Sequence, residues 1–186
     1  MKRAWGLIVF LLLGASAMAD DEFTLYELLA PDSHRFAITY DVAAEREGDR
    51  YFLNPIREGS IATDERAVDR ATGKPLRFEL VKGAIKVELA TPVPKGGARR
   101  IRIFKTYADA KSYYPEGDRI VFDRGLSIRR NAVVLPAGYE LVSCSVPAIV
   151  STEADGRVKA SFVNDRDDVL PVKIVGRRLP AAGGVR

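Results

Sequence analysis

The chain has 186 residues, a formal net charge of +4, one histidine and one cysteine, and hydrophobic residues make up 47% of it. This length suits one domain with a substantial hydrophobic core. The single Cys144 excludes an internal disulfide, and one histidine with one cysteine gives too few good ligands for a zinc site.

The first 19 residues have the pattern of a secretory signal peptide. Lys2 and Arg3 precede an apolar run at 7–13, and Ala-Met-Ala at 17–19 gives a small-x-small ending, so cleavage is expected before Asp20. The apolar run is shorter than the roughly 20 residues that cross a bilayer, which makes an uncleaved anchor the lesser alternative. The mature protein is therefore predicted to be secreted or periplasmic and not to span a membrane.

Residues 20–31 are expected to be an N-terminal lead-in, with a turn or two of helix at 23–29. Strand signals follow, because large apolar residues alternate with polar ones, as in antiparallel sheets that have one face in water. The alternating segments lie at 36–42, 76–80, 85–89, 100–103, 157–162 and 170–175. A continuous apolar run at 132–135 indicates a strand covered on both faces.

Clusters of Gly, Pro and Asp separate these short segments, as they do in sandwiches and barrels. The sequence therefore predicts an all-β fold, an antiparallel β-sandwich with little helix, formed by a single domain over residues 32–179. A flexible tail is expected at 180–186, where the residues are small and polar.

The tetrapeptide Glu-Gly-Asp-Arg occurs twice, at 47–50 and 116–119, but the residues around the two copies have nothing in common. A duplicated unit should share more than four residues. The preferred interpretation is turn chemistry, in which glycine supplies a positive φ and aspartate caps the turn ahead of a strand.

Other polar groups do not form a recognisable catalytic motif. Cys144 is interpreted as a buried thiol and His34 as an exposed polar residue, in preference to a nucleophilic Cys–His pair. Residues 164–168 hold three carboxylates but lack the spacing and the glycine of a calcium loop, so a hairpin turn is expected. No metal site, cofactor or catalytic residue is predicted. Acidic residues are plentiful, so a hydrolase that uses two carboxylates stays the alternative.

Charge is distributed unevenly along the chain. The net charge is −5 over residues 20–94, +6 over 95–130 and +1 over 131–186. Arginines and lysines interleaved with tyrosines can bind sugars, peptides or anions, and a functional face, if present, is predicted on the segment 99–130. Its candidate residues are Arg100, Arg102, Tyr107, Tyr113, Tyr114, Arg129 and Arg130. The preferred alternative is a solvated basic strand face followed by a loop whose tyrosines cover the sandwich edge.

The run Ile-Lys-Val-Glu-Leu-Ala-Thr-Pro-Val-Pro-Lys-Gly-Gly at 85–97, followed by the strand at 101–107, resembles the N-terminal β-domain of gluzincin aminopeptidases. With Tyr-Asp-Val at 40–42, the resemblance covers residues 36–107. It implies a β-sandwich module and no activity, because the catalytic helix and zinc ligands of those enzymes have no counterpart here. Residues 133–139 also resemble exported bacterial β-sandwich proteins, which implies no mechanism.

The sequence thus predicts an exported, non-catalytic β-sandwich that serves as an accessory or binding module of the cell envelope. Its expected partner is an envelope component or an acidic protein, because export argues against nucleic acid.

Overall fold

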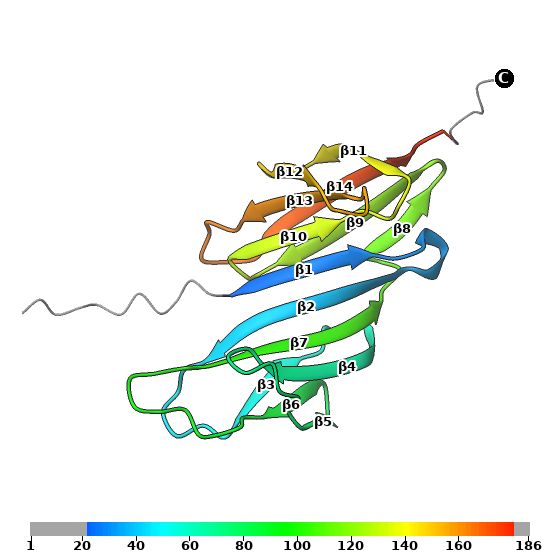
Figure 1. Cartoon of the computed structure of the whole chain (residues 1–186). Coiled ribbons are helices and arrows are strands. Elements are labelled where there is room, and N and C mark those ends of the chain that lie inside the picture. Colours follow the sequence, from blue (N-terminus) through cyan, green and yellow to red (C-terminus); the bar gives the residue numbers. More distant parts are fainter. Residues whose placement is uncertain (1–21, 181–186) are drawn as a thin grey trace, which may run out of the picture.

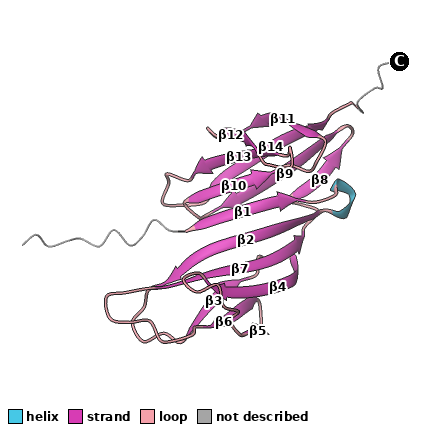
Figure 2. Ribbon diagram, in the orientation of Figure 1, coloured by secondary structure: helices cyan, strands magenta, loops and turns pink. Residues whose placement is uncertain are grey.

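The structure is a computed structural model that describes residues 22–180. The predicted signal peptide at 1–19 and the predicted tail, except for its first residue, lie outside the described residues. Strand accounts for 58% of the described residues and helix for 2%, which confirms the all-β prediction (Figure 2). Within residues 22–180, no helix is long and apolar enough to cross a membrane.

The described chain forms three sheets (Figure 1). The largest has seven strands in the order β12-β13-β10-β1-β2-β7-β4, and the other two are β11-β14-β9-β8 and β3-β6-β5. The elements are β1 (Phe23–Leu28), a 3₁₀ turn η1 (Pro31–Ser33), β2 (Arg35–Ala44), β3 (Tyr51–Pro55), β4 (Ile61–Asp69), β5 (Phe78–Val81), β6 (Ala84–Glu88), β7 (Arg99–Ala108), β8 (Tyr113–Glu116), β9 (Arg119–Leu126), β10 (Arg130–Val134), β11 (Tyr139–Cys144), β12 (Ile149–Thr152), β13 (Val158–Val163) and β14 (Leu170–Arg178).

Both smaller sheets pack on the same face of the seven-stranded sheet, so the protein is a sandwich whose second layer is divided in two. The four-stranded sheet covers one half around a core that includes Phe36, Phe122 and Val133. The three-stranded sheet covers the other half around a second core that includes Val42, Ile85 and Ile103. Successive side chains of a strand point to opposite faces of its sheet. In β2 the even-numbered side chains point toward the second layer, and in β7 the odd-numbered ones do, in agreement with the register in which the two strands pair.

The sheets are antiparallel except at one place. β1 pairs in parallel with β10 and antiparallel with β2, so the first strand of the fold lies in the middle of the largest sheet. This corrects two expectations, namely helix at 23–29 and a domain that begins at residue 32. Apolar residues at 23, 26 and 29 have helical spacing, but pairing on both sides makes this segment a strand that buries Thr24, Tyr26 and Leu28.

Both Glu-Gly-Asp-Arg segments are turns, as predicted. Gly48 and Gly117 have φ values of 82° and 65°, which glycine adopts without strain. The second copy forms the two-residue β8–β9 hairpin, in which Glu116 pairs with Arg119. The acidic segment at 164–168 is also a turn, since the Asn164 amide donates to the carbonyl of Asp168 at 2.8 Å.

His34 and Cys144 have separate environments. His34 is half-buried in a left-handed conformation, and its Nδ1 donates to the carbonyl of Tyr113 at 3.0 Å. Cys144, at the end of β11, is a free thiol that packs partly buried against the larger core. His34 is thus less exposed, and Cys144 less buried, than the sequence suggested.

Candidate functional site

A polar cavity lies on the seven-stranded sheet at the seam between the two smaller sheets. Its volume is about 340 Å³, and its floor comes from β1, β2 and β7, while its walls come from β3 and β9 with the residues that follow them. The lining residues are Thr24, Tyr26, Ile38, Tyr40, Asn54, Pro55, Arg57, Lys105, Tyr107, Arg124, Gly125, Leu126, Ser127 and Ile128. Three of them are cations and none is a carboxylate, so the wall is suited to an anion.

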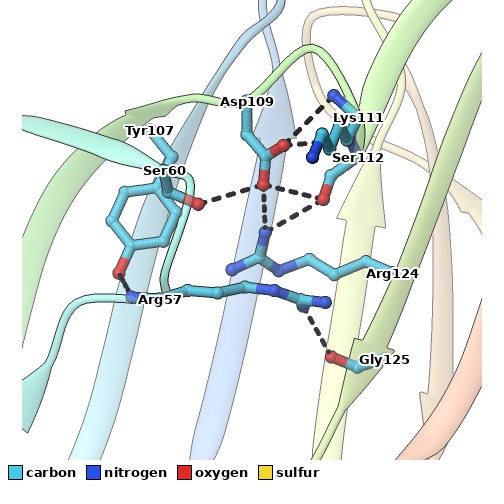
Figure 3. A network of polar contacts seen from close by, with 8 residues as sticks. All are labelled: Arg57, Ser60, Tyr107, Asp109, Lys111, Ser112, Arg124 and Gly125. Atoms are coloured by element: carbon cyan, nitrogen blue, oxygen red, sulfur yellow. Dashed lines mark hydrogen bonds and ion pairs between the residues drawn. The ribbon is translucent and has the colours of Figure 1, made fainter.

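Arg124 of β9 is held in a buried ion pair behind the cavity (Figure 3). Its NH1 donates to Asp109 Oδ2 at 3.0 Å, and this oxygen also accepts hydrogen bonds from Ser60 Oγ at 3.0 Å and Ser112 Oγ at 2.8 Å. Burial alone would raise the pKa of Asp109, but the hydrogen bonds from Ser112 and Ser60 and the charge of Arg124 hold this pKa below its usual value. Asp109 is therefore a fixed anion that neutralises Arg124.

Lys105 of β7 has no such neutralising contact. Only 6% of the residue is exposed, and its Nζ donates to Asn54 Oδ1 at 2.5 Å and lies 4.8 Å from the centre of the Tyr107 ring. Burial, followed by repulsion from Arg124, lowers the pKa of Lys105 to about 8, although Glu65 acts in the opposite direction. The cavity thus contains a buried ammonium group whose charge is poorly compensated.

Glu65 belongs to an irregularity in the edge strand β4. The register with β7 shifts between Thr63 and Arg66, and Asp64 has a φ of 59°, which is uncommon for a residue other than glycine. Glu65 Oε1 is buried without a hydrogen-bond partner. This bulge places Glu65 where its charge acts on Lys105 without a direct ion pair.

Tyrosine side chains complete the floor of the cavity. Arg124 lies over the Tyr107 ring at 5.3 Å, on a ring that Lys105 also approaches, so the two cations share one aromatic side chain. Burial raises the pKa of Tyr26, Tyr40 and Tyr107, which keeps their hydroxyl groups protonated near neutral pH. Thr24 Oγ1 lies beside the Tyr26 hydroxyl but makes no hydrogen bond of normal geometry.

Arg57 links the two smaller sheets at the mouth of the cavity. It follows β3 in the chain, is exposed, and its NH1 donates to the carbonyl of Gly125 in β9 at 3.2 Å (Figure 3). Its backbone N–H donates to the Tyr107 hydroxyl at 3.3 Å. These two bonds place the third cation of the wall at the solvent side of the site.

The seven residues predicted as a binding face do not form one surface. Tyr107 lies in the cavity floor and is only 2% exposed. Arg102 projects from the opposite face of the same strand. There its guanidinium donates to both oxygens of Asp41, at 2.6 and 2.8 Å. Arg100 is two residues away in β7 and therefore lies on the same face as Arg102. Because this ion pair occupies both oxygens of the buried Asp41 carboxylate, it is a structural contact more than a ligand site.

The other four predicted residues are also separated. Tyr113 is buried in the larger core and donates its hydroxyl proton to the carbonyl of Leu29 at 2.7 Å, while Tyr114 is its half-buried neighbour in β8. Arg129 and Arg130 are exposed at the start of β10, and Arg130 Nε lies 3.4 Å from the carbonyl oxygen of Glu22. A role for Arg129 and Arg130 in binding stays a prediction, whereas buried Tyr113 does not contribute to a surface.

Several polar residues of the site were not among the candidates named from the sequence, including Arg57, Lys105, Arg124, Asp109 and Asn54. A signal for Lys105 was present, because it continues the inward phase of Ile101 and Ile103 and precedes Tyr107 in that phase. A lysine at a strand position whose side chain points inward indicates one of two things. Either the alternation was assigned to the wrong face of the strand, or a polar site lies on the inward face. Among residues 22–180, no group of three or more His, Cys, Asp or Glu side chains could hold a metal ion.

Comparison with known proteins supports the fold. No protein-family model matches the chain, and no curated protein matches it. Among solved structures, an M1 zinc metallopeptidase from Deinococcus radiodurans matches with a TM-score of 0.57 and 12% identity, over 84% of this chain and 41% of that one. An aminopeptidase N family protein from Idiomarina loihiensis matches with a TM-score of 0.51 and 10% identity, over 83% of this chain and 29% of that one.

The chain therefore spans less than half the length of these enzymes. The matches confirm the resemblance to the N-terminal β-domain of M1 aminopeptidases at the level of the fold. At 10–12% identity, these matches show the class of β-domain that the chain resembles in fold, and they assign no activity to it.

Proposed function

We propose that the protein is an exported, non-catalytic binding module of the cell envelope, and that the cavity between its two smaller sheets is its ligand site. The observation that supports binding is the composition of the cavity wall, which combines three cations with tyrosines and contains no carboxylate. Pockets of this size with a few convergent polar groups are typical sites for small ligands. The signal-peptide pattern of residues 1–19 supports export.

The alternative, a carboxylate-dependent hydrolase, has less support. Such an enzyme needs two carboxyl groups that face one substrate, one of them with a raised pKa. Among residues 22–180, the two buried aspartates are engaged elsewhere, Asp109 by Arg124 and Asp41 by Arg102. Burial and the nearby Glu45 raise the pKa of Glu22, but Glu22 does not line the cavity.

The test has two parts. The full chain is expressed in a bacterial host, and the exported product is measured by intact mass, which should correspond to a start at Asp20. This mature protein is then incubated with soluble fragments of purified cell envelope, with bound and free fragments identified by mass spectrometry. Retention of unaltered fragments supports the proposal. A full-length product kept in the membrane contradicts export, and chemically altered fragments contradict a non-catalytic role.

A further inference from the structure

The unused donors of the cavity define the charge of its ligand. Lys105 has three N–H donors, and in the described part of the chain only the bond to Asn54 engages them. Arg124 is neutralised by Asp109, whereas Arg57 at the mouth donates only to the Gly125 carbonyl. When the negative charge of Glu65 is counted against the positive charge of Lys105, the site retains about one positive charge that no side chain offsets. That excess matches a monoanion better than a dianion.

The size and surface of the cavity define the rest of the ligand. A volume of about 340 Å³ is near the lower limit for ligand pockets, which excludes the body of a polymer. Ile38, Leu126 and Ile128 supply apolar wall, and the rings of Tyr26 and Tyr107 supply flat contact surface. The site is therefore suited to a short molecule with one charged end and a small apolar body.

We propose that this cavity binds a small carboxylic acid, whose carboxylate is held by Lys105 and the wall arginines and whose apolar part contacts Ile38 and the tyrosine rings. The proposal rests on the function proposed above and specifies the ligand class of the same site. A terminal carboxylate of a short peptide and a free organic acid share this chemistry. Inorganic phosphate, which has no apolar part, should bind less well because it cannot contact Ile38 or the tyrosine rings.

The experiment compares three probes on the mature protein by isothermal titration calorimetry at pH 7. N-acetylalanine carries one carboxylate, N-acetylalaninamide has nearly the same shape without charge, and inorganic phosphate is an anion without an apolar body. We expect saturable binding of N-acetylalanine, at least about tenfold weaker binding of the amide, and weaker binding of phosphate.

Two variants localise the binding. Lys105→Met keeps most of the length of the side chain and removes its charge, and Arg57→Gln removes the charge at the mouth. Each should weaken N-acetylalanine binding by about tenfold or more. Lys173→Met is the matched control, because Lys173 is exposed and its Nζ lies 4.0 Å from Asp123 Oδ2, and it should bind as the wild type does. Circular dichroism of each variant verifies that it is folded.

The affinity should also depend on pH, because bound carboxylate favours protonated Lys105. The groups that face Lys105 are Glu65 of β4, Asn54 of β3, Arg124 of β9 and tyrosines of β1, β2 and β7. With a pKa of about 8 in the free protein, most Lys105 is neutral at pH 9.5, so affinity for N-acetylalanine should fall by up to about 30-fold between pH 7 and pH 9.5. The Lys105→Met variant should lack this change.

The outcomes separate the two proposals. Equal binding of the acid and the amide, tighter binding of phosphate, no binding of any probe by the folded protein, or unchanged affinity in Lys105→Met would each overturn the carboxylate site. An altered envelope fragment in the preceding test would overturn the non-catalytic function and leave the carboxylate site standing.

Discussion

At the scale of single residues, the pair of Arg124 and Asp109 is the most consequential polar contact of the described chain. Their side chains are 6% and 7% exposed, and Asp109 also fixes Ser60 and Ser112. Removal of one partner of a buried ion pair leaves an uncompensated charge, which costs more than the pair contributes. Asp109 therefore supports the site by keeping Arg124 in place.

Asp109→Ala should lower the free energy of unfolding by about 3–5 kcal/mol in urea denaturation at pH 7. Asp155→Ala removes an exposed aspartate that pairs with Arg157 and should leave the unfolding free energy close to that of the wild type. The double variant Asp109→Ala/Arg124→Met should recover much of the loss, since it removes both charges. A loss in the double variant equal to the sum of the single losses would contradict the pairing.

Lys105 should give the stability a distinctive pH dependence. Its pKa of about 8 in the folded protein lies below the value of about 10.4 in the unfolded chain, so between these values the unfolded state binds more protons. The penalty for burying the charge is fully present below pH 8, and stability rises as pH increases from 8 toward 10. The difference in unfolding free energy between wild type and Lys105→Met should change by about 2 kcal/mol between pH 8 and pH 10. A constant difference would show that Lys105 is not buried as a cation.

At the scale of elements, period-2 alternation predicted the strands with one apolar face. β2, β6, β7 and β13 were found in this way, and the run at 132–135 was recognised as covered on both faces. β1 was missed because its parallel partner β10 lies far along the chain, so the pairing that places β1 inside the sheet is not visible in the local sequence. β4 was missed because a bulge interrupts its alternation at Asp64 and most of its side chains are exposed at an edge.

The β8–β9 hairpin tests the interpretation of the repeated tetrapeptide. Gly117 has a φ of 65°, and a Cβ added at this position would have no heavy atom within 4 Å, so Gly117→Ala introduces backbone strain without a steric clash. We expect a loss of about 1 kcal/mol in unfolding free energy. Asp118→Ala, at the next position, should change stability by less than about 0.5 kcal/mol. Equal effects at both positions would contradict a special role for the positive φ of Gly117.

At the scale of the whole molecule, sequence predicted the fold class but named few of the residues that line the proposed site. The resemblance at 36–107 correctly indicated the aminopeptidase-type β-domain, because strand and turn rhythm is local. The cavity joins Tyr26, Asn54, Lys105 and Arg124 from four separate strands, and only the packing of two sheets on a third brings them together. Candidate residues selected by local charge and tyrosine content therefore included one member of the cavity, Tyr107.

The divided second layer should not divide the protein thermodynamically. β2 contributes Phe36 to the larger core and Val42 to the smaller one, and β7 contributes Tyr107 and Ile103 in the same way. Two cores that share strands should unfold together. We expect one calorimetric transition in which the calorimetric and van't Hoff enthalpies agree. Two resolved transitions, or two stable proteolytic fragments, would show that the halves are independent.

The proposed site depends on a buried, poorly neutralised ammonium group that lines a ligand cavity at the junction of three sheets. The most direct test is an NMR titration of the Lys105 side chain in the ligand-free mature protein, with its Cε–Hε signal assigned by its absence in Lys105→Met. We predict a pKa of about 8 for this side chain. A pKa near 10.4, roughly the value of a lysine in water, would contradict the buried site and the ligand proposed for it.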